Sequence, residues 1–304
     1  MSTPAVSVVL PAFNRVHAIR DAVDSVLRQT WTDFELLVVD DCSTDDTLAV
    51  VRAVDDPRVR VLSTPRNMGP SGARNVGIAE ARGAWVAFQD SDDEWMPEKL
   101  ARQMARLSET RETPWIAAYC GMIIVGGVMV NGPGRTKVRY FPGPEIEAVE
   151  GDILPTLLRT SLVSTQMLVV RRDELERIGG FDENLPALVD WDLVLRLAER
   201  GPFAFVDEPL VLQRFSSNSI TRDQARRTLA LEQIIEKHQP QLSRMPGLLA
   251  QQYRTLAGAH RRLGRVAEAH QAIEKARRVQ PRDPTLWMRS AYLNFRMVTR
   301  RLFG

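Results

Sequence analysis

The sequence predicts an α/β fold, in which a Rossmann-like, mostly parallel sheet is flanked by helices and followed by an α-helical extension. Two observations predict the sheet. Short β-branched and aromatic runs alternate with longer segments of helical apolar spacing through the first third of the chain, and acidic residues closely follow two of the runs. A third observation predicts the extension: the last quarter of the chain has helical spacing without strand patterns.

The expected elements follow in order along the chain. The strands, which are all short and β-branched, are expected at residues 6–10, 34–39, 59–62 and 85–88. The helices are expected at residues 16–29, 43–54, 71–82 and 97–109. The apolar stretch 115–130 is shorter than the roughly 20 residues that a bilayer span needs, so we interpret it as sheet. Such alternation favours parallel strands joined by right-handed crossovers.

Composition excludes several classes of protein. The 40 basic and 38 acidic residues nearly cancel, so bulk binding to nucleic acid is not expected, although arginine is concentrated near the C-terminus. Two cysteines and four scattered histidines form neither a disulfide framework nor the spacing of a zinc site. The N-terminus lacks the charged and apolar regions of a secretory signal, so we expect a cytoplasmic protein.

A cluster of acidic residues follows the fourth expected strand, in the stretch Asp90-Ser91-Asp92-Asp93-Glu94. The carboxyl ends of strands in an α/β sheet form the edge where ligands bind, and carboxylate oxygens are ligands for hard cations. A divalent metal site is therefore one interpretation. The other is an acidic turn that caps the helix beginning near Pro97.

Two further polar clusters fall at the same predicted edge. Phe13, Asn14 and Arg15 follow the first strand, and Asp40 and Asp41 end the second. No glycine-rich phosphate loop follows the first strand, which disfavours a dinucleotide dehydrogenase or a P-loop enzyme. A bound phosphate would need another counter-charge, which a divalent ion and arginines would supply.

These motifs together resemble the family-2 inverting glycosyltransferases of the GT-A fold. The resemblance covers about residues 5–221 and rests on five stretches, which are 6–15, 25–45, 67–77, 88–97 and 179–193. It implies a nucleotide-diphospho-sugar donor, with UDP expected, and Mn²⁺ or Mg²⁺ as cofactor. The acceptor would be a hydroxyl of a glycan or a lipid-linked acceptor, in the assembly of a cell-envelope polysaccharide.

The resemblance also implies roles for individual residues. Phe13 would stack on the base, Asp41 would accept a hydrogen bond from the base, and Asp40 would support that turn or contact the nucleoside. Arg15 and Arg74 would face the diphosphate. Asp90 would contact the ribose or the sugar, and Asp92 would bind the metal. The same donor set includes Pro11 and Ser91, which lie within the matching motifs.

The catalytic base is expected in the second half of the chain, where Asp190-Trp191-Asp192 opens an apolar-periodic helix. From the residues alone, Asp190 is equally interpretable as a base or as a helix cap. The resemblance favours the base, with Asp192 as the cap or first-turn acid. Asp182, Glu183 and Trp191 are assigned to the acceptor side, and turn chemistry is the alternative for the two acids.

One position departs from the family pattern. Many relatives carry a histidine shortly after an arginine in the strand and loop that follow the base helix, and Ser216 aligns there. Ser216 or water would have to replace that metal or diphosphate ligand, so weaker metal affinity is expected.

The region from residue 222 is expected to be helical. The spacing of Tyr253, Leu256, Ala257 and Pro281, with Trp287 recurring 34 residues after Tyr253, resembles one tetratricopeptide unit and part of the next. The hairpin is expected to pack on the catalytic domain or on a partner. The final segment mixes bulky apolar residues with arginine, and both a peripheral membrane contact and a solvated last helix remain open.

We therefore expect a catalytic domain at 1–221, with a nucleotide-binding half at 1–112 and an acceptor half at 113–221, and a helical region at 222–304. The function predicted from the sequence is metal-dependent, inverting glycosyl transfer. Two alternatives remain open, namely a metal-dependent nucleotidyltransferase and an interaction protein that binds nucleotide without turnover.

Overall fold

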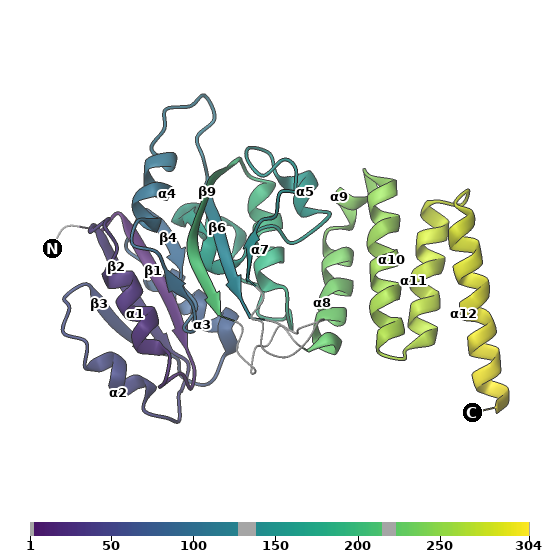
Figure 1. The fold of residues 1–304 in the computed structure, drawn as a ribbon, viewed down its shortest axis with the longest axis horizontal. Coiled ribbons are helices and arrows are strands. Elements are labelled where there is room, and N and C mark those ends of the chain that lie inside the picture. The colour runs from purple at the N-terminus through teal and green to yellow at the C-terminus, as the bar shows by residue number, and fades with distance from the viewer. Residues whose placement is uncertain (1–2, 127–137, 215–222, 304) are drawn as a thin grey trace. The chain divides into compact units, whose positions relative to one another are not determined.

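The computed structural model describes residues 3–126, 138–214 and 223–303, with side chains described as far as residue 297. The chain forms two compact units. The first comprises Met1–Glu183 and Val189–Asn218, and the second comprises Asn184–Leu188 and Ser219–Gly304. We refer to them as the first unit and the helical unit (Figure 1). The division into the two halves 1–112 and 113–221 stays a prediction.

The first unit alternates strands and helices and then becomes mixed. Its strands are β1 (Val6–Ala12), β2 (Phe34–Asp40), β3 (Val59–Ser63), β4 (Trp85–Phe88), β5 (Glu94–Trp95), β6 (Ala117–Val125), β7 (Val138–Phe141), β8 (Val169–Arg171) and β9 (Phe203–Arg214). Its helices are α1 (Ile19–Leu27), α2 (Thr47–Arg52), α3 (Gly69–Glu80), α4 (Lys99–Leu107), α5 (Leu154–Leu157), the 3₁₀ turn η1 (Thr165–Met167), α6 (Arg172–Ile178) and α7 (Val189–Ala198).

The described strands form one sheet in the order β3-β2-β1-β4-β8-β6-β9-β5, with β7 paired to β6. The α/β class and the helical C-terminal region are confirmed. Strands β1 to β4 pair in parallel, as the alternation predicts, whereas β8 runs antiparallel to both β4 and β6. The sheet is therefore mixed, because the parallel strand–helix units extend only through the first half of the unit.

The boundaries of the expected elements shift by a few residues. β1 runs through Pro11 to Ala12 instead of stopping before the proline. Backbone polar groups of alternate residues in β1 point toward β4, and the last such bond runs from Gln89 N to Val9 O, just past the end of β4. Residue 11 points to the same side beyond the end of β4. Proline is therefore tolerated there, because no described strand lies opposite to accept from a backbone N–H. Helix α3 begins at Gly69 rather than at 71, with Pro70 in its first turn.

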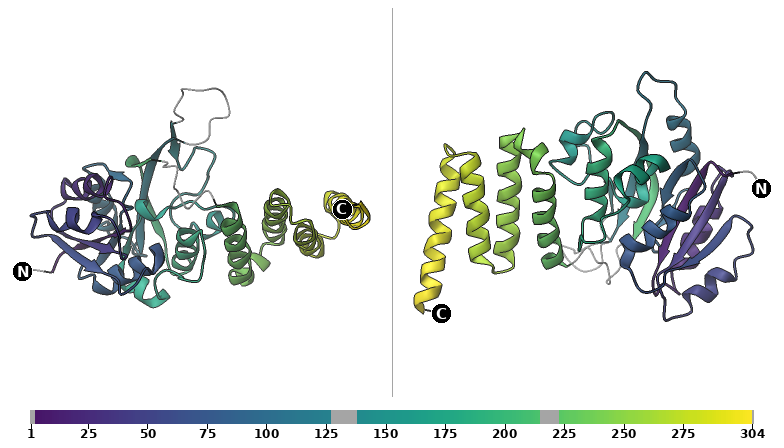
Figure 2. Two further views of the ribbon diagram at one scale, coloured as in Figure 1. Left: turned by 90° about the horizontal axis from the view of Figure 1, so that it is seen from below. Right: turned by 180° about the vertical axis from the view of Figure 1, so that it is seen from behind.

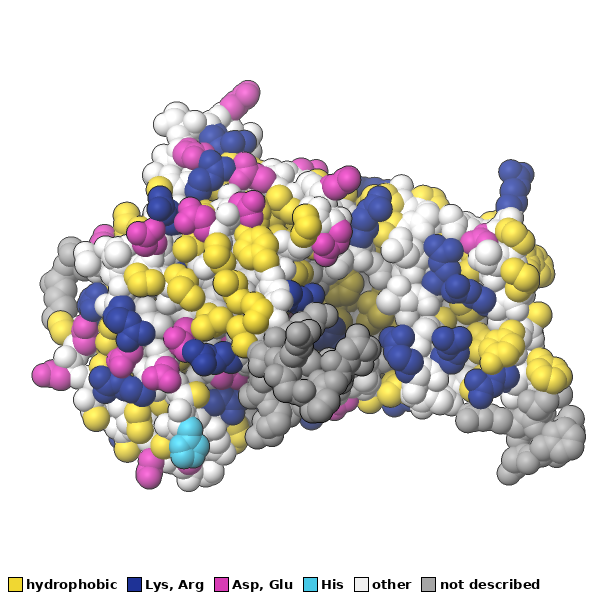
Figure 3. Space-filling view, viewed as in Figure 1, with side chains coloured by type: hydrophobic (Ala, Val, Ile, Leu, Met, Phe, Trp, Pro, Cys, Tyr) yellow, Lys and Arg dark blue, Asp and Glu magenta, His cyan; other side chains and the backbone are white. Residues whose placement is uncertain are grey.

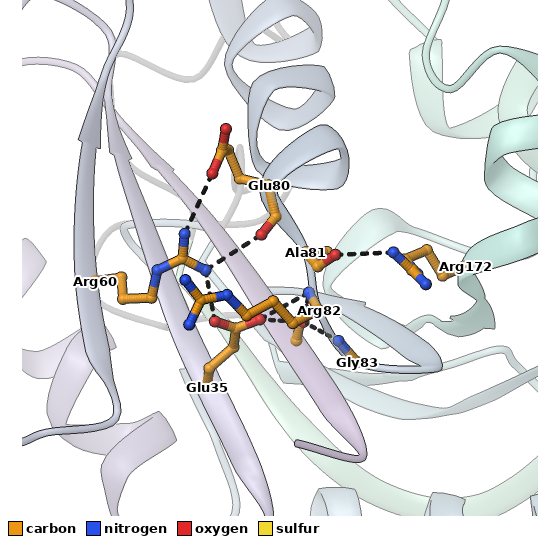
Figure 4. Close-up of polar contacts among 8 residues, drawn as sticks. Glu35, Arg60, Glu80, Ala81, Arg82, Gly83 and Arg172 are labelled. Carbon is orange, nitrogen blue, oxygen red and sulfur yellow. Dashed lines mark hydrogen bonds and ion pairs between the residues drawn. The ribbon is translucent and has the colours of Figure 1, made fainter. Parts of the chain in front are cut away.

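The amino ends of β1, β2 and β3 are joined by a polar network on Glu35 (Figure 4). Ser7 Oγ donates to Glu35 Oε1 at 2.7 Å, and Arg60 donates to Glu35 Oε2 at 2.7 Å. The backbone N–H of Arg82, just past α3, donates to the same carboxylate at 2.8 Å. This network fixes the sheet at the edge opposite to the predicted site.

The helical unit contains α8 (Gln224–Lys237), α9 (Gln239–Ser243), α10 (Pro246–Arg262), α11 (Val266–Val279) and α12 (Pro284–Phe303). Helices α10, α11 and α12 pack side by side in sequence order (Figure 2). Gly264 takes a left-handed φ of 74° in the turn between α10 and α11, where glycine is favoured. Small and aliphatic side chains such as Leu256, Ala269 and Ile273 are buried between the helices. No helix among the described residues is long and apolar enough to cross a bilayer.

Candidate active site

The polar clusters that follow β1, β2 and β4 meet at one edge of the sheet, which we call the rim. The strand register requires this. β1 pairs in parallel with β2, so that Ala12 is opposite Asp40, and with β4, so that Val9 is opposite Phe88. The segments beginning at Phe13, Asp41 and Gln89 therefore leave the sheet side by side. The convergence expected from the sequence is present in the structure.

The loops after β1 and β2 are bonded to each other. Asn14 takes a left-handed φ of 52°, and its side chain accepts a hydrogen bond from Thr44 N at 2.8 Å. Arg15 N donates to Thr47 Oγ1 at 2.7 Å. These bonds hold the backbone directly after Phe13, which is 42% exposed. Such an exposed aromatic ring on a fixed backbone can stack on a planar ligand.

Asp40 and Asp41 are both buried, and their carboxylates accept hydrogen bonds from backbone N–H groups of the neighbouring loops. The Asp40 carboxylate accepts from Ser43 N at 3.3 Å. Asp41 Oδ1 accepts from Met68 N and Thr64 Oγ1, and Asp41 Oδ2 accepts from Gly69 N, each at 2.8 Å. Asp41 thereby fastens the segment that leads into α3. Contact between Asp41 and a nucleotide base remains a prediction, because these three bonds leave one of the roughly four lone-pair sites of the carboxylate.

Arg74 and Asp90, which are separated along the chain, form an ion pair with a distance of 2.5 Å between Arg74 Nη2 and Asp90 Oδ1. Arg74 comes from α3, and its guanidinium also lies 5.4 Å from the centre of the Phe181 ring. The side chain is buried, and its Nε has no hydrogen-bond partner among the described residues. A buried guanidinium with an unused donor is suited to an anionic ligand.

Asp92 lies close to these charges. Burial raises the pKa of its carboxyl, and the charge of Asp90 raises it further, while Arg15 and Arg74 act in the opposite direction. The cluster thus combines two neighbouring carboxylates with two arginines. A divalent cation fits this arrangement, because its positive charge would offset the burial and the repulsion from Asp90 that disfavour the ionised carboxylate of Asp92. Asp92, the predicted metal ligand, would hold it together with Asp90, which was predicted from the sequence to contact the ribose or the sugar. Within the described parts of the chain, no group of three His, Cys, Asp or Glu side chains is arranged to bind a metal.

Asp93 is a buried acid of the same turn for which the sequence predicted no role. It is 2% exposed, and Arg214 N donates to its Oδ1 at 3.3 Å. Gln89 donates to its backbone carbonyl at 2.6 Å. These contacts connect the acidic turn to the end of β9. Burial, together with the charges of Asp90 and Asp92, raises the pKa of Asp93 well above its ordinary range. Ser91 is buried in the same turn. Ser216 lies outside the described residues.

Asn75, for which the sequence predicted no role, connects the turn of the acceptor-side candidates Asp182 and Glu183 to the rim. Asn75 donates to Phe181 O at 2.9 Å and to Glu183 Oε1 at 2.8 Å, and it accepts from Phe181 N at 2.8 Å. The Phe181 ring packs edge-on against Phe88 of β4. The turn that carries Asp182 and Glu183 is therefore attached to α3 beside Arg74. The sequence signal that could have identified Asn75 is its position directly after Arg74 in the matching stretch 67–77.

Helix α7 carries three predicted residues in different environments. Asp192 is fully buried and pairs with Arg196 at 2.8 Å, and Arg196 donates to the carbonyls of Ile178 and Gly180. Asp192 therefore stabilises the turn before Phe181. Trp191 is also buried, with its indole N–H donating to Leu157 O at 2.6 Å. Asp190 is only partly buried, and its Oδ1 accepts from Trp191 N at 2.8 Å in the first helical turn.

These contacts place α7 in the same assembly as the rim. Arg196 attaches α7 to the Gly179-Gly180 turn, Asn75 attaches the following residues to α3, and Arg74 of α3 is paired with Asp90. The roles predicted for Asp190 as a base and for Trp191 on the acceptor side are not tested by this geometry.

The chain matches two family models. The model described as Glycosyl transferase family 2 matches residues 7–140, and a tetratricopeptide repeat model matches residues 250–293. Among curated proteins, the chain is similar to the "Succinoglycan biosynthesis protein ExoO" of Rhizobium meliloti (strain 1021), with 48% identity over 160 residues. The match covers 53% of this chain and 43% of that relative, so the chain spans less than half of its length.

Two solved structures share the fold at low sequence identity. The S. aureus TarS 1-349 structure in complex with UDP-GlcNAc has a TM-score of 0.65 at 20% identity, covering 90% of this chain and 82% of that one. The mannosyltransferase PcManGT of Pyrobaculum calidifontis, in complex with GDP-Man and Mn²⁺, has a TM-score of 0.61 at 20% identity, covering 100% and 82%. The first unit thus has the GT-A fold of these solved glycosyltransferases, residues 7–140 match the glycosyltransferase family 2 model, and residues 250–293 of the helical unit match a tetratricopeptide repeat.

Proposed function

We propose that the protein transfers a sugar, with inversion, from a nucleotide-diphosphate sugar to a hydroxyl of a glycan or lipid-linked acceptor. The observation that carries the proposal is the meeting at the rim of Phe13, Arg15, the Arg74–Asp90 pair and Asp92. These groups offer a stacking ring, cations for a diphosphate and carboxylates for a divalent ion, which are the parts that such a donor needs.

The donor is proposed to be a UDP-sugar, and the pathway to be the assembly of a cell-envelope polysaccharide. The family assignment supports the reaction class, and succinoglycan biosynthesis, named for the relative, supports the pathway. The structural neighbours hold UDP-GlcNAc in one case and GDP-Man in the other, so a donor panel must include both bases.

The chain's own residues have distinct parts in the proposed reaction. Arg15 and Arg74 bind the diphosphate, and their charges stabilise the leaving nucleoside diphosphate as the glycosidic bond to it breaks. Asp90 and Asp92 would hold Mn²⁺ or Mg²⁺, which supplies Lewis-acid stabilisation of the same leaving group. Asp190 accepts the proton of the attacking hydroxyl, and attack from the face opposite to the leaving group inverts the anomeric carbon.

The donor is identified by incubating the purified protein with UDP-, GDP- and dTDP-sugars in the presence of Mn²⁺ and measuring the released nucleotide. We expect release with UDP-sugars and loss of release on chelation of the metal. Asp92→Asn should weaken donor binding in Mn²⁺ but change binding little in the presence of EDTA. Release that is equal with and without chelator would contradict the proposed metal dependence.

Asp190→Asn separates the enzyme from an interaction protein that binds nucleotide without turnover. The amide cannot accept the acceptor's proton, so we expect unchanged donor affinity and a loss of turnover of roughly 100- to 10,000-fold. The matched control is Asp24→Asn, which makes the same chemical change in an exposed pair with Arg20 on α1. Full turnover in Asp190→Asn would remove this residue as the base.

A further inference from the structure

Helix α12 has two apolar faces, of which one is packed and the other exposed. Leu286, Ser290 and Leu293, spaced at i, i+4 and i+7, are buried toward α11. On other sides of the same helix, Trp287 is 53% exposed, Met288 66%, Tyr292 51% and Phe295 67%. Most of the large apolar side chains that are exposed in the described structure belong to these four residues. Met288, Tyr292 and Phe295 also follow the i, i+4, i+7 spacing and form one stripe.

The stripe lies in a strongly basic part of the chain. Residues 223–304 hold sixteen arginines and lysines against six aspartates and glutamates, although the whole chain has 40 basic and 38 acidic residues. The sequence of α12 contains no acidic residue, and the exposed Arg289 directly follows Met288. Figure 3 shows hydrophobic side chains at the C-terminal end of the helical unit with basic side chains beside them.

The acidic groups nearest in sequence to this face are already neutralised. Glu274 of α11 pairs with Arg277 at 2.6 Å and accepts from Ser290 Oγ. Asp283 pairs with Arg254 at 3.2 Å. The indole ring of Trp287 is fixed in orientation, because its N–H donates to Pro281 O and the Arg277 guanidinium lies 4.0 Å from its ring centre. The exposed surface of α12 is therefore apolar and cationic, and its tryptophan is fixed.

We propose that this face of α12 docks on an anionic lipid surface, lying in the plane of the membrane. An anionic bilayer offers both an apolar interior for the stripe and negative charge for the arginines, and a fixed tryptophan suits its interface. A second copy of the chain fits less well, because α12 has no carboxylate to receive the arginines of a partner's α12. Nucleic acid would match the charge but not the bulky apolar stripe.

This inference does not rest on the proposed sugar transfer. Its test measures binding to lipid without donor or acceptor, so the two proposals can fail separately.

The test is co-sedimentation of the full chain with vesicles of phosphatidylglycerol and phosphatidylcholine in equal parts, with pure phosphatidylcholine vesicles for comparison. We expect binding to the anionic vesicles only, weakening as salt is raised because the charges are screened. The triple variant Met288→Glu, Tyr292→Glu and Phe295→Glu should abolish binding. Arg289→Gln should weaken it about fivefold, which corresponds to the contribution of one basic residue near the surface, on the order of 1 kcal/mol.

The control is Leu229→Glu on α8, where another exposed apolar residue receives one such charge. It should bind like the unmodified chain. All variants change exposed side chains, and circular dichroism verifies that their helices are intact. Absence of binding to anionic vesicles by the unmodified chain would overturn the proposal. So would equal binding by the triple variant, or light scattering that shows a dimer which only the triple variant dissociates.

Discussion

The buried amine of Lys99 is unusual among the ionisable groups of the first unit. Its side chain is fully buried in α4, where Nζ donates to Gln103 at 2.7 Å and lies 3.9 Å from the centre of the Trp95 ring. No carboxylate is among these partners. Burial lowers the pKa of Lys99 to about 8, with a smaller opposing effect of Cys120. The folded state therefore disfavours the charged amine.

We expect the stability of the unmodified chain relative to Lys99→Met to rise with pH. Below the folded pKa of about 8, the lysine is charged in both states and folding carries the full penalty. As the pH rises from there toward the unfolded value, the folded chain loses the charge first and the penalty disappears. The difference in unfolding free energy should change by about 2 kcal/mol between neutral pH and about pH 10.

Urea denaturation of both proteins across that pH range measures this change. The control is Lys275→Met, which removes an exposed lysine on α11 and should show no such trend. Parallel stability curves for the unmodified chain and Lys99→Met would show that the buried amine does not titrate in this range.

Residues adjacent to a strand end could be placed from the sequence, because strand order and direction decide where they lie. This covers Phe13, Arg15, Asp40, Asp41, Asp90 and Asp92. The Arg74–Asp90 pair was not predicted, since it depends on how α3 crosses the sheet. Nor does spacing distinguish Asp190 from Asp192. Only packing shows that Asp192 is buried against Arg196 while Asp190 is partly exposed.

At the scale of elements, the contact of α3 with β1 depends on a glycine. A Cβ added to Gly77 would lie 2.3 Å from Val9 Cγ1, closer than atoms can approach. Gly77 thus allows α3 to lie close to the strand whose end carries Phe13 and Arg15. The packing of this helix helps to set the position of Arg74, one turn earlier on the same helix.

Gly77→Ala should lower the unfolding free energy by about 2 kcal/mol, because the helix must move away from β1. Urea denaturation measures the change. Combining it with Val9→Ala, which removes the clashing methyl groups, should cost less than the sum of the two single changes. The control Gly258→Ala, in the middle of α10 where the nearest atom is 3.7 Å away, should stabilise by about 0.5–1 kcal/mol. Strict additivity of the pair would disprove the proposed clash.

The elements of the first half were predictable because each has a clear period and clear boundaries. The expected strand at 85–88 matches β4, and those at 34–39 and 59–62 end one residue short of β2 and β3. Strands β5, β7 and β8 were not foreseen, since they are two to four residues long and have no period to detect. Their places in the sheet come from pairing with strands distant in sequence.

For the whole molecule, the two units each contain their own core. The rim residues all come from the first unit, whereas Leu256, Ala269 and Ile273 form part of the core of the helical unit. The sequence predicted a change of texture near residue 222, because β-patterned runs stop there. It did not predict that residues 184–188 belong with the helical unit, which is a matter of contacts across the fold.

Ile273→Ala should destabilise the helical unit without altering donor binding. The side chain is 2% exposed, and truncating a buried isoleucine costs about 2–5 kcal/mol. Hydrogen exchange should accelerate in α10 and α11, while the affinity for UDP, measured by calorimetry, stays unchanged. Ala substitution of the exposed Lys275 is the control. A parallel fall in UDP affinity would show that the rim depends on the helical unit.

The bonds of Asp41 have a consequence for how a donor would bind. Its carboxylate holds Thr64, Met68 and Gly69 in place before any ligand arrives. A nucleotide entering at the rim would therefore meet a preorganised backbone, and its binding free energy would not include the entropic cost of ordering this segment. Its association would then be limited by encounter with the rim rather than by a slow rearrangement of this segment.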